Sequence, residues 1–355
     1  MYEFPIQRAQ TLKDKPDPQT LVFGKTFTDH MFLMRYDAGQ GWHDGQILPY
    51  APLPLEPSAM VFHYAQEVFE GMKAYRTPDG GVQLFRPMEN VKRLNSSCQR
   101  LCIPALPEEL TLEAIKALVK VEADWVPSQP GTSLYIRPFV IATDPSLGVH
   151  ASHSYLFCVI CCPVGAYYKE GINPVRIYVE SEDVRAVRGG TGYTKCGGNY
   201  AASIRAGERA EERGYAQVLW LDGVERRYIE EVGSMNVLFK VDGTVITPTL
   251  TGSVLPGITR KSCLELLRHW EIPVEERLIT AQELFDAADA GKLEEAFGSG
   301  TAAVVSPIGE MGWGDRQTVV NGGKIGALTQ RLYDTLTGIQ WGTQSDPFGW
   351  TVKVV

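Results

Sequence analysis

Two short stretches decide the fold class of this chain: Val218-Leu-Trp-Leu-Asp-Gly-Val-Glu-Arg-Arg-Tyr-Ile229 and Asn236-Val-Leu-Phe-Lys-Val-Asp-Gly-Thr-Val-Ile-Thr247. In each, an Asp-Gly pair separates two runs of residues that favour β-strands, which is a strong signal for an antiparallel hairpin. Two consecutive hairpins do not fit a strict alternation of strands and helices. The sequence therefore predicts an α+β fold rather than a doubly wound parallel sheet.

The rest of the chain mixes strands and helices without an internal repeat. Apolar residues recur at helical spacing in the longer segments, and β-branched or aromatic runs mark the strands. Thr280 and Glu283 form a capping box, which predicts that a further helix begins there. The pattern predicts strands at 133–142, 154–162 and 175–180, and helices at 88–103, 108–126, 199–213, 259–270 and 324–336.

The chain is long and acidic. Its 355 residues exceed the roughly 250–300 that one hydrophobic core usually serves, which predicts two domains and a cleft. It has 34 Lys and Arg against 42 Asp and Glu, a net charge of -8, whereas a nucleic-acid binder needs an excess of basic residues. No segment is apolar and long enough for a signal peptide or a membrane span, so we expect a cytoplasmic protein. The segment 163–174, with its prolines and glycines, is the best candidate for a linker.

Neither the cysteines nor the histidines form a specific metal or redox motif. Cys158 and Cys161 spell Cys-x-x-Cys, but they lie in an apolar run that is typical of a buried strand, where residues three apart face opposite sides. The odd number of cysteines, 7, also argues against a disulfide framework. His150 and His153 have no cysteine or acidic motif beside them in the sequence. We therefore expect loop histidines and no metal site.

Two glycine-rich segments are candidates for anion binding. Gly298-Ser-Gly-Thr-Ala-Ala303 matches the dinucleotide fingerprint formally, but a strand-like run follows it instead of the helix that the fingerprint requires. A plain turn, or a turn whose backbone N–H groups face an anion, fits better. Leu255-Pro-Gly-Ile-Thr-Arg260 precedes a helix for which Thr259 is a natural N-cap. The N–H groups of Ile258 and Thr259 could bind an anion there, or the segment is simply a capped helix.

One lysine and one pair of acids are candidates for catalysis. Lys195 is framed by glycines, and a desolvated lysine becomes a nucleophile toward aldehydes; the alternative is a solvated loop lysine. Glu230 and Glu231 follow each other on a predicted strand, so at most one is expected to point inward. An inward carboxylate could keep a ring nitrogen protonated, and the alternative is a pair of exposed acids at the end of a strand.

The order of these segments resembles that in the branched-chain amino acid aminotransferases, which are pyridoxal phosphate-dependent enzymes of fold type IV. The resemblance covers nearly the whole chain, and the joint presence of several ordered motifs is highly specific. The motifs that carry it include His63-Tyr-Ala-Gln-Glu-Val-Phe-Glu-Gly71, Lys195-Cys-Gly-Gly-Asn-Tyr200 and Glu231-Val-Gly-Ser-Met-Asn236, with segments 21–31, 84–87, 135–138, 255–260 and 298–302.

The resemblance implies how pyridoxal 5'-phosphate is bound. Lys195 would carry the cofactor as a Schiff base and later move the substrate α-proton. Glu231 resembles the partner of the pyridinium nitrogen, and Tyr200 the residue bonded to the ring hydroxyl. The residues that would hold the phosphate or lie against the ring are Arg93, Ile258, Thr259, Thr301 and Leu255.

The resemblance also implies a substrate site. Tyr135, with the backbone N–H groups of Thr301 and Ala302, would hold the α-carboxylate, and Arg137 would pair with the γ-carboxylate of glutamate or 2-oxoglutarate. Arg185 resembles a residue of an interdomain loop near the site. The apolar wall that receives a branched side chain would consist of Phe23, Tyr64, Phe69 and Tyr167.

The implied architecture is α+β: a small N-terminal α/β domain at 1–165, a linker at 166–174 and a larger cofactor-binding domain at 175–355 with a mixed or antiparallel, barrel-like sheet. The implied reaction transfers the amino group of L-leucine, L-isoleucine or L-valine to 2-oxoglutarate, in a homodimer. Within the same fold type, a D-amino acid aminotransferase or an aminodeoxychorismate lyase is the alternative. A silent binding protein on this scaffold and a Rossmann dehydrogenase are more distant alternatives.

Two positions depart from the pattern of the family. Some animal relatives carry a redox Cys-x-x-Cys just after the Gly-Thr-Ala turn, where this chain has Ala303 and Ser306. Peroxide control through that pair is therefore not expected. Lys73 stands where a short bacterial relative has arginine, which leaves the fine tuning of the substrate site open.

Overall fold

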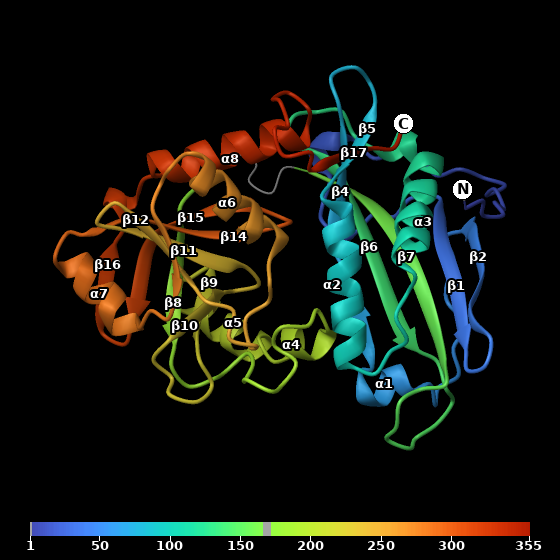
Figure 1. Cartoon of the computed structure of the whole chain (residues 1–355), viewed down its shortest axis with the longest axis horizontal. Coiled ribbons are helices and arrows are strands. Elements are labelled where there is room, and N and C mark those ends of the chain that lie inside the picture. Colours follow the sequence, from blue (N-terminus) through green and yellow to red (C-terminus); the bar gives the residue numbers. More distant parts are fainter. Residues whose placement is uncertain (1, 166–171) are drawn as a thin grey trace. The chain divides into compact units, whose positions relative to one another are not determined.

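A computed structural model of the chain describes residues 2–165 and 172–355 (Figure 1). The described residues form two compact units. The first contains the described part of 1–167 with 194–197 and 338–355, and the second contains the described part of 168–193 with 198–337. The domains predicted at 1–165 and 175–355 stay a prediction, and these units group 194–197 and 338–355 with the N-terminal part instead. The predicted linker lies largely outside the described residues.

The first unit is built on an antiparallel sheet. Among the described residues it has eight strands in the order β17-β5-β4-β6-β7-β1-β2, with β3 paired to β6. The predicted strand at 133–142 is confirmed, and the one predicted at 154–162 runs two residues further. The strands are β1 (His30–Asp37), β2 (Gly41–Pro49), β3 (Glu67–Phe69), β4 (Met72–Arg76), β5 (Val82–Phe85), β6 (Ser133–Ala142), β7 (Ser154–Val164) and β17 (Thr351–Lys353).

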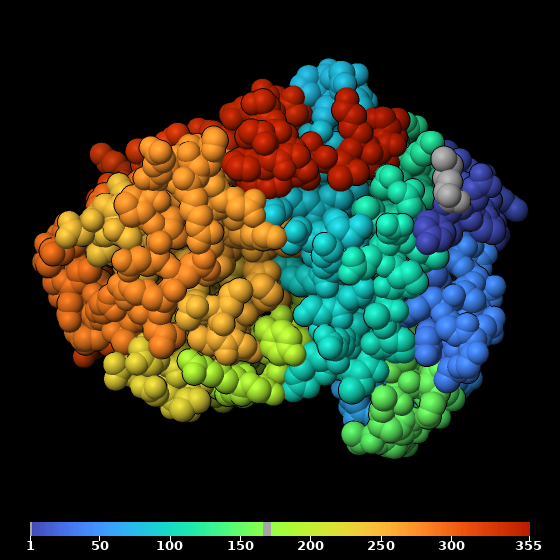
Figure 2. Space-filling model, viewed as in Figure 1, coloured from blue at the N-terminus to red at the C-terminus, as the bar shows by residue number. Residues whose placement is uncertain are grey.

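Helices cover one face of this sheet. In Figure 1, α2 (Pro87–Arg100) and α3 (Glu108–Val121) lie side by side along the strands, and Figure 2 shows their side chains as the surface over that face. Both helices turn a stripe of apolar residues to the core, Val91, Leu94 and Cys98 in α2 among them. The short elements of the unit are η1 (Pro18–Thr20), α1 (Met60–Tyr64) and η2 (Ala123–Trp125).

The second unit has a mixed sheet. Its nine described strands follow the order β10-β9-β8-β15-β14-β11-β12-β13, with β16 paired to β15, and both parallel and antiparallel pairs occur. The combination of antiparallel and mixed sheets with separate helices confirms the predicted α+β class. The strands are β8 (Val175–Glu180), β9 (Gln217–Leu221), β10 (Ile229–Val232), β11 (Asn236–Val241), β12 (Thr244–Pro248), β13 (Val274–Arg277), β14 (Leu293–Gly300), β15 (Val304–Trp313) and β16 (Arg316–Val319).

Both predicted hairpins form, since β9 pairs with β10 and β11 with β12 as antiparallel neighbours, but only one of the two predicted Asp-Gly turns is confirmed. Asp242 and Gly243 join β11 to β12 with φ of 50° and 80°, the left-handed values that a tight hairpin turn needs. Between β9 and β10, however, the connection extends over 222–228. The Asp222 carboxylate accepts backbone N–H groups of four later loop residues, Val224, Glu225, Arg227 and Tyr228, and so organises a wider loop than an Asp-Gly turn.

The helices of the second unit differ from the predictions at their ends. The predicted helix at 199–213 is interrupted at 202–203, where both the hydroxyl and the N–H of Ser203 donate to the Tyr200 carbonyl. Gly257, not Thr259, is the N-cap of the helix that follows, whereas the cap of Glu283 by Thr280 is confirmed. The helices are α4 (Gly197–Ala201), α5 (Ile204–Glu212), α6 (Ile258–His269), α7 (Ala281–Asp289), η3 (Asn321–Gly323) and α8 (Ala327–Gln340).

The dinucleotide-like segment and the Cys-x-x-Cys pair both lie in ordinary structural elements. Residues 301–303 form the turn between the antiparallel strands β14 and β15, so the dinucleotide fingerprint is excluded. Cys158 and Cys161 lie buried in β7 as free thiols. No helix in the described part of the chain is both long and apolar enough to cross a membrane.

Candidate active site

The segment that carries Lys195 is held in place by three hydrogen bonds. The Phe69 N–H of β3 donates to the Lys195 carbonyl at 2.9 Å, and the Lys195 N–H donates to Ser97 Oγ of α2 at 2.9 Å. The Gly197 N–H donates to the Glu67 carboxylate. A side chain at Gly197 would collide with that carboxylate, because its Cβ would lie 2.4 Å from Glu67 Oε1. The backbone on both sides of Lys195 is therefore fixed.

The amine of Lys195 is enclosed although the residue as a whole is only partly buried. Burial lowers the pKa of Lys195 to about 8; the Arg93 charge acts in the same direction and the Glu70 carboxylate opposes it. The Nζ atom lies 4.8 Å from the centre of the Phe69 ring. The solvated loop lysine considered from the sequence is thus excluded, and a sizeable fraction of this amine is neutral near pH 8.

Arg93 is fixed by a buried carboxylate that the sequence did not single out. Its Nε and Nη2 donate to the two oxygens of Glu70 at 2.7 and 2.9 Å, and Asn90 and the Gly71 N–H donate to Glu70 as well. Glu70 is fully buried, and the Arg93 charge keeps its pKa below the ordinary value against the effect of burial. The position of Glu70 in the 63–71 motif was the one signal that could have pointed to it.

Four of the predicted substrate residues meet in the first unit. Arg137 Nη2 donates to the Tyr135 hydroxyl at 2.9 Å, and the guanidinium lies 4.6 Å from the centre of the Phe69 ring. The Phe23 ring packs edge-on against Tyr135 at 4.8 Å. A Cβ at Gly71 would lie 2.1 Å from the Tyr135 hydroxyl, so this position requires glycine. The Arg137 Nε is buried and has no hydrogen-bond partner among the described residues.

The other two predicted wall residues are Tyr64 and Tyr167. Tyr64 is 39% exposed, and its hydroxyl donates to the carbonyl of Leu147 in the loop between β6 and β7. The centre of its ring lies 6.2 Å from that of the His63 ring. Tyr167 lies outside the described residues.

In the second unit, both acids of the predicted pair are buried. Glu231 Oε1 accepts the Leu255 N–H at 2.6 Å, and Oε2 forms an ion pair with Arg185 Nε at 3.1 Å. Glu230 accepts the Ser253 hydroxyl, and burial raises its pKa. The expectation that at most one of them points inward was wrong, because the loop before α6 supplies a donor to each. The two carboxylates differ in their partners: Glu231 forms an ion pair with the Arg185 guanidinium, whereas Glu230 accepts a hydrogen bond from the Ser253 hydroxyl.

The predicted anion-binding segments are also held closely. Asn236 Nδ2 donates to the Leu255 carbonyl at 2.9 Å, and a Cβ at Gly257 would lie 1.9 Å from Asn236 Oδ1. Ile258 and Thr259 are the first two residues of α6, where helix N–H groups have no intrahelical acceptor. Thr301 and Ala302 lie in the turn after β14, and Tyr200 lies on α4.

The comparisons with known proteins assign the family. A family model described as amino-transferase class IV matches residues 67–311. The chain therefore belongs to the class IV aminotransferases. It is 57% identical to the branched-chain-amino-acid aminotransferase 2 of Bacillus subtilis, over 98% of this chain and 96% of that protein. The probable branched-chain-amino-acid aminotransferase of Staphylococcus aureus N315 is 55% identical over 98% of both chains.

Solved structures agree with this family. The branched-chain aminotransferase of Escherichia coli matches with a TM-score of 0.77 and 26% identity, over 91% of this chain and 99% of that one. The T.th. branched-chain amino acid aminotransferase with pyridoxamine 5'-phosphate matches with a TM-score of 0.77 and 27% identity, over 91% and 98% of the two chains. Enzymes of this class depend on pyridoxal phosphate. An enclosed lysine with a pKa of about 8 and a buried, paired Glu231 fit that cofactor.

Proposed function

We propose that this enzyme transfers the amino group of L-leucine, L-isoleucine or L-valine to 2-oxoglutarate, giving glutamate and a branched 2-oxo acid, with pyridoxal 5'-phosphate on Lys195. The observation that carries the proposal is the enclosed Lys195 amine beside Arg93 and Phe69. The branched-chain aminotransferases that match nearly the whole chain at 55–57% identity support the choice of substrate.

Lys195 is the proposed acid and base of the reaction. When bound, pyridoxal phosphate supplies an aldehyde that carries the amino group and a ring that accepts electrons from the substrate. The Lys195 amine, with a pKa of about 8, can take a proton from the substrate α-carbon and return it near neutral pH. The hydrogen bonds at Phe69, Ser97 and Gly197 would keep the amine at a constant position during that transfer.

Glu231 is the proposed partner of the ring nitrogen. A carboxylate that accepts the Leu255 N–H and pairs with Arg185 is held in one orientation. Opposite a ring nitrogen, its charge would keep that nitrogen protonated. For the phosphate we propose Arg93, whose guanidinium Glu70 orients, with the N–H groups of Ile258 and Thr259 and with Thr301. Tyr200 at the ring hydroxyl and Leu255 at the ring face complete the proposed cofactor residues.

Arg137 and Tyr135 are the proposed groups for substrate carboxylates. The buried Nε of Arg137 lacks a partner among the described residues, and a guanidinium binds a carboxylate with two donors. We assign Arg137 to the γ-carboxylate of 2-oxoglutarate, and Tyr135 with the N–H groups of Thr301 and Ala302 to the α-carboxylate. Phe23, Phe69, Tyr64 and Tyr167 form the proposed apolar wall.

A homodimer in the cytoplasm is part of the same proposal. Several large apolar side chains are exposed in the first unit, among them Phe62 at 61%, Leu147 at 64% and Val149 at 84%. Apolar residues gathered on a surface are typical of a protein–protein contact. A second copy of the chain is the partner that the resemblance implies. Sedimentation velocity should therefore show about twice the mass of one chain.

A panel of amino donors tests the substrate assignment. Purified protein with pyridoxal phosphate and 2-oxoglutarate should form glutamate from L-leucine, L-isoleucine and L-valine, and not from their D-forms. Turnover of D-amino acids would favour a D-amino acid aminotransferase, and pyruvate release from aminodeoxychorismate would favour the lyase. Neither alternative is favoured by the relatives at 55–57% identity.

A further inference from the structure

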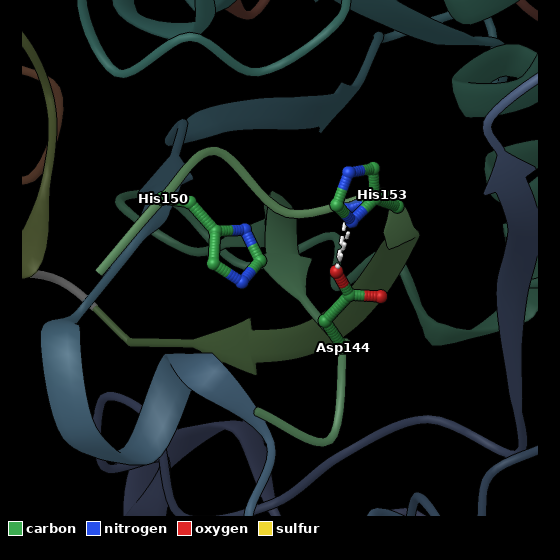
Figure 3. A group of neighbouring side chains, drawn as sticks. All are labelled: Asp144, His150 and His153. Atoms are coloured by element: carbon green, nitrogen blue, oxygen red, sulfur yellow. Dashed lines mark hydrogen bonds and ion pairs between the residues drawn. The ribbon is translucent and has the colours of Figure 1, made fainter. Parts of the chain in front are cut away.

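Asp144, His150 and His153 come together in the segment that connects β6 to β7. One potential ligand atom of each lies within 4.8 Å of the others. Figure 3 shows both imidazole rings beside the Asp144 carboxylate, with His153 directly bonded to it. Both histidines lie in a loop, as predicted, but the chain folds back on itself between 144 and 153 and brings Asp144, which belongs to no sequence motif, beside them. We propose that these three residues form a binding site for a divalent transition-metal ion such as Zn²⁺.

The carboxylate of this cluster is held in a defined orientation. Asp144 Oδ2 accepts the His153 N–H at 2.7 Å and lies 2.9 Å from His153 Nδ1, and Oδ1 accepts the Ser154 hydroxyl at 3.1 Å. The backbone also pairs here, since the Thr143 N–H donates to the Ser154 carbonyl at 3.0 Å. These contacts fix the direction in which the carboxylate oxygens point, and a carboxylate is a suitable ligand for a divalent metal ion.

The two imidazoles can present lone pairs. His150 Nδ1 lies 2.8 Å from the Ala151 carbonyl, to which it can only donate, so in the neutral ring Nε2 is the unprotonated nitrogen. That Nε2 lies 3.3 Å from Ser146 Oγ, and metal binding would break only this long hydrogen bond. The His153 side chain is 72% exposed, and a bound ion would replace its hydrogen bond to Asp144, because both groups would then face the metal. Around Zn²⁺, with bonds of about 2.0–2.1 Å, ligand atoms lie nearer than 4.8 Å, and small rotations of these rings would close the difference.

The ligand set selects the class of ion. Two imidazoles and one carboxylate suit Zn²⁺, Ni²⁺ or Cu²⁺, whereas Mg²⁺ and Ca²⁺ prefer oxygen ligands alone. Three protein ligands leave a fourth position for water. An ion here would tie together the two ends of a loop that carries the exposed Leu147 and Val149. Metal binding would thus restrict that loop without requiring any step of amino transfer.

Calorimetric titration of the chelator-treated holoenzyme with Zn²⁺ tests the site. The intact protein should bind one more Zn²⁺ per chain than the His150→Asn and His153→Asn variants, and bind Mg²⁺ far more weakly. Losing an imidazole should weaken binding at least about tenfold, since loss of even an orienting partner has that effect. His43→Asn is the matched control, because His43 also contacts two carboxylates, Asp37 and Asp44, and its loss should leave the Zn²⁺ affinity unchanged.

Hydrogen exchange supplies a second measurement. With Zn²⁺ present, amides at 145–151 should exchange more slowly in the intact protein and not in His150→Asn, whose hydrogen bonds are local and whose fold should persist. No Zn²⁺ binding, or equal binding by the intact protein and both histidine variants, would overturn the proposal. Neither measurement depends on amino transfer. The metal site can therefore be disproved while the proposed aminotransferase function holds, and the function can be disproved while the metal site holds.

Discussion

Arg93 binds Glu70 with two donors of its guanidinium, at 2.7 and 2.9 Å, and both charges act on the amine of Lys195. The arginine lowers the pKa of the lysine and the glutamate raises it. Glu70 has almost no exposed surface, so its charge depends on this pairing. The pair therefore positions a cation beside the lysine while keeping the local charge nearly balanced.

Replacing Glu70 by glutamine should destabilise the fold strongly. The change leaves the Arg93 charge without its buried partner, which typically costs about 3–5 kcal/mol. Glu113→Gln is the control: Glu113 pairs with Lys116 on the surface of α3, and such pairs contribute about 0–1 kcal/mol. Urea unfolding of both variants measures the difference. Equal midpoints would mean that the buried pair contributes no more than a surface pair.

Glu67 should act on Lys195 through the backbone. Glu67→Gln keeps an oxygen that can accept the Gly197 N–H, whereas Glu67→Ala removes it. We expect the glutamine variant to retain most of kcat and the alanine variant to lose about tenfold or more, with a smaller change in KM, because a displaced amine slows proton transfer. Steady-state kinetics with L-leucine, together with the thermal midpoints, decides this. A kcat loss that only follows the loss of stability would contradict a positioning role.

Glu231→Gln should keep the cofactor and slow the proton transfer. Glutamine can still accept the Leu255 N–H, but it lacks the charge that would hold a ring nitrogen protonated. We expect single-turnover rates with L-leucine to fall at least about a hundredfold. Glu230→Gln is the neighbouring control, since Glu230 bonds to Ser253 instead of a cation, and it should change the rate far less. Similar losses in both variants would remove the special role of Glu231.

Arg137→Gln should discriminate between the two substrates. The variant loses the guanidinium that is proposed for the γ-carboxylate of 2-oxoglutarate, whereas L-leucine has no such group. The KM for 2-oxoglutarate should rise at least about tenfold while that for L-leucine changes less. Initial rates measured with each substrate varied in turn give both constants. Equal increases would assign Arg137 to a general structural role next to Tyr135 and Phe69.

The rate at which cofactor-free protein reacts with pyridoxal phosphate should rise with pH. The neutral amine is the nucleophile, and the lowered pKa of Lys195 makes it abundant above about pH 8. The rate of yellow colour formation should therefore rise with pH and level off above about 8. For an ordinary lysine, with a pKa of about 10.4, it would still be rising at pH 9. Stopped-flow absorbance measures the profile.

Features that depend on neighbouring residues were predicted well. The turn at Asp242 and Gly243 needs only two residues with positive φ, and the cap of Glu283 by Thr280 spans one helical turn. The loop at 222–228 was missed because the Asp222 side chain bonds to residues up to Tyr228 and overrides the Asp-Gly signal. The helix at 258–269 was predicted with its cap placed at Thr259 because side-chain preference favoured threonine over Gly257.

In the candidate site, too, features set by local sequence motifs were predicted, whereas features set by tertiary packing were missed. Lys195, Glu231, Tyr135 and Arg137 were predicted as site residues from ordered motifs, and their roles stay predictions. Glu70 was missed because its partner Arg93 lies 23 positions away and only tertiary packing brings them together. The burial of both Glu230 and Glu231 could not be read from strand alternation, since it depends on the loop that supplies Ser253 and Leu255. The approach of Asp144 to His150 and His153 was also missed, because it depends on how the loop between β6 and β7 folds back on itself.

Borohydride reduction followed by peptide mass mapping tests the central claim most directly. Lys73 is the internal control, because burial lowers its pKa to about 8 as well, so basicity alone would label both lysines. If Lys195 holds the cofactor, reduction of the yellow protein should place one phosphopyridoxyl group per chain on Lys195 and leave Lys73 unmodified. A colourless protein, or a label on Lys73 or elsewhere in place of Lys195, would contradict the account.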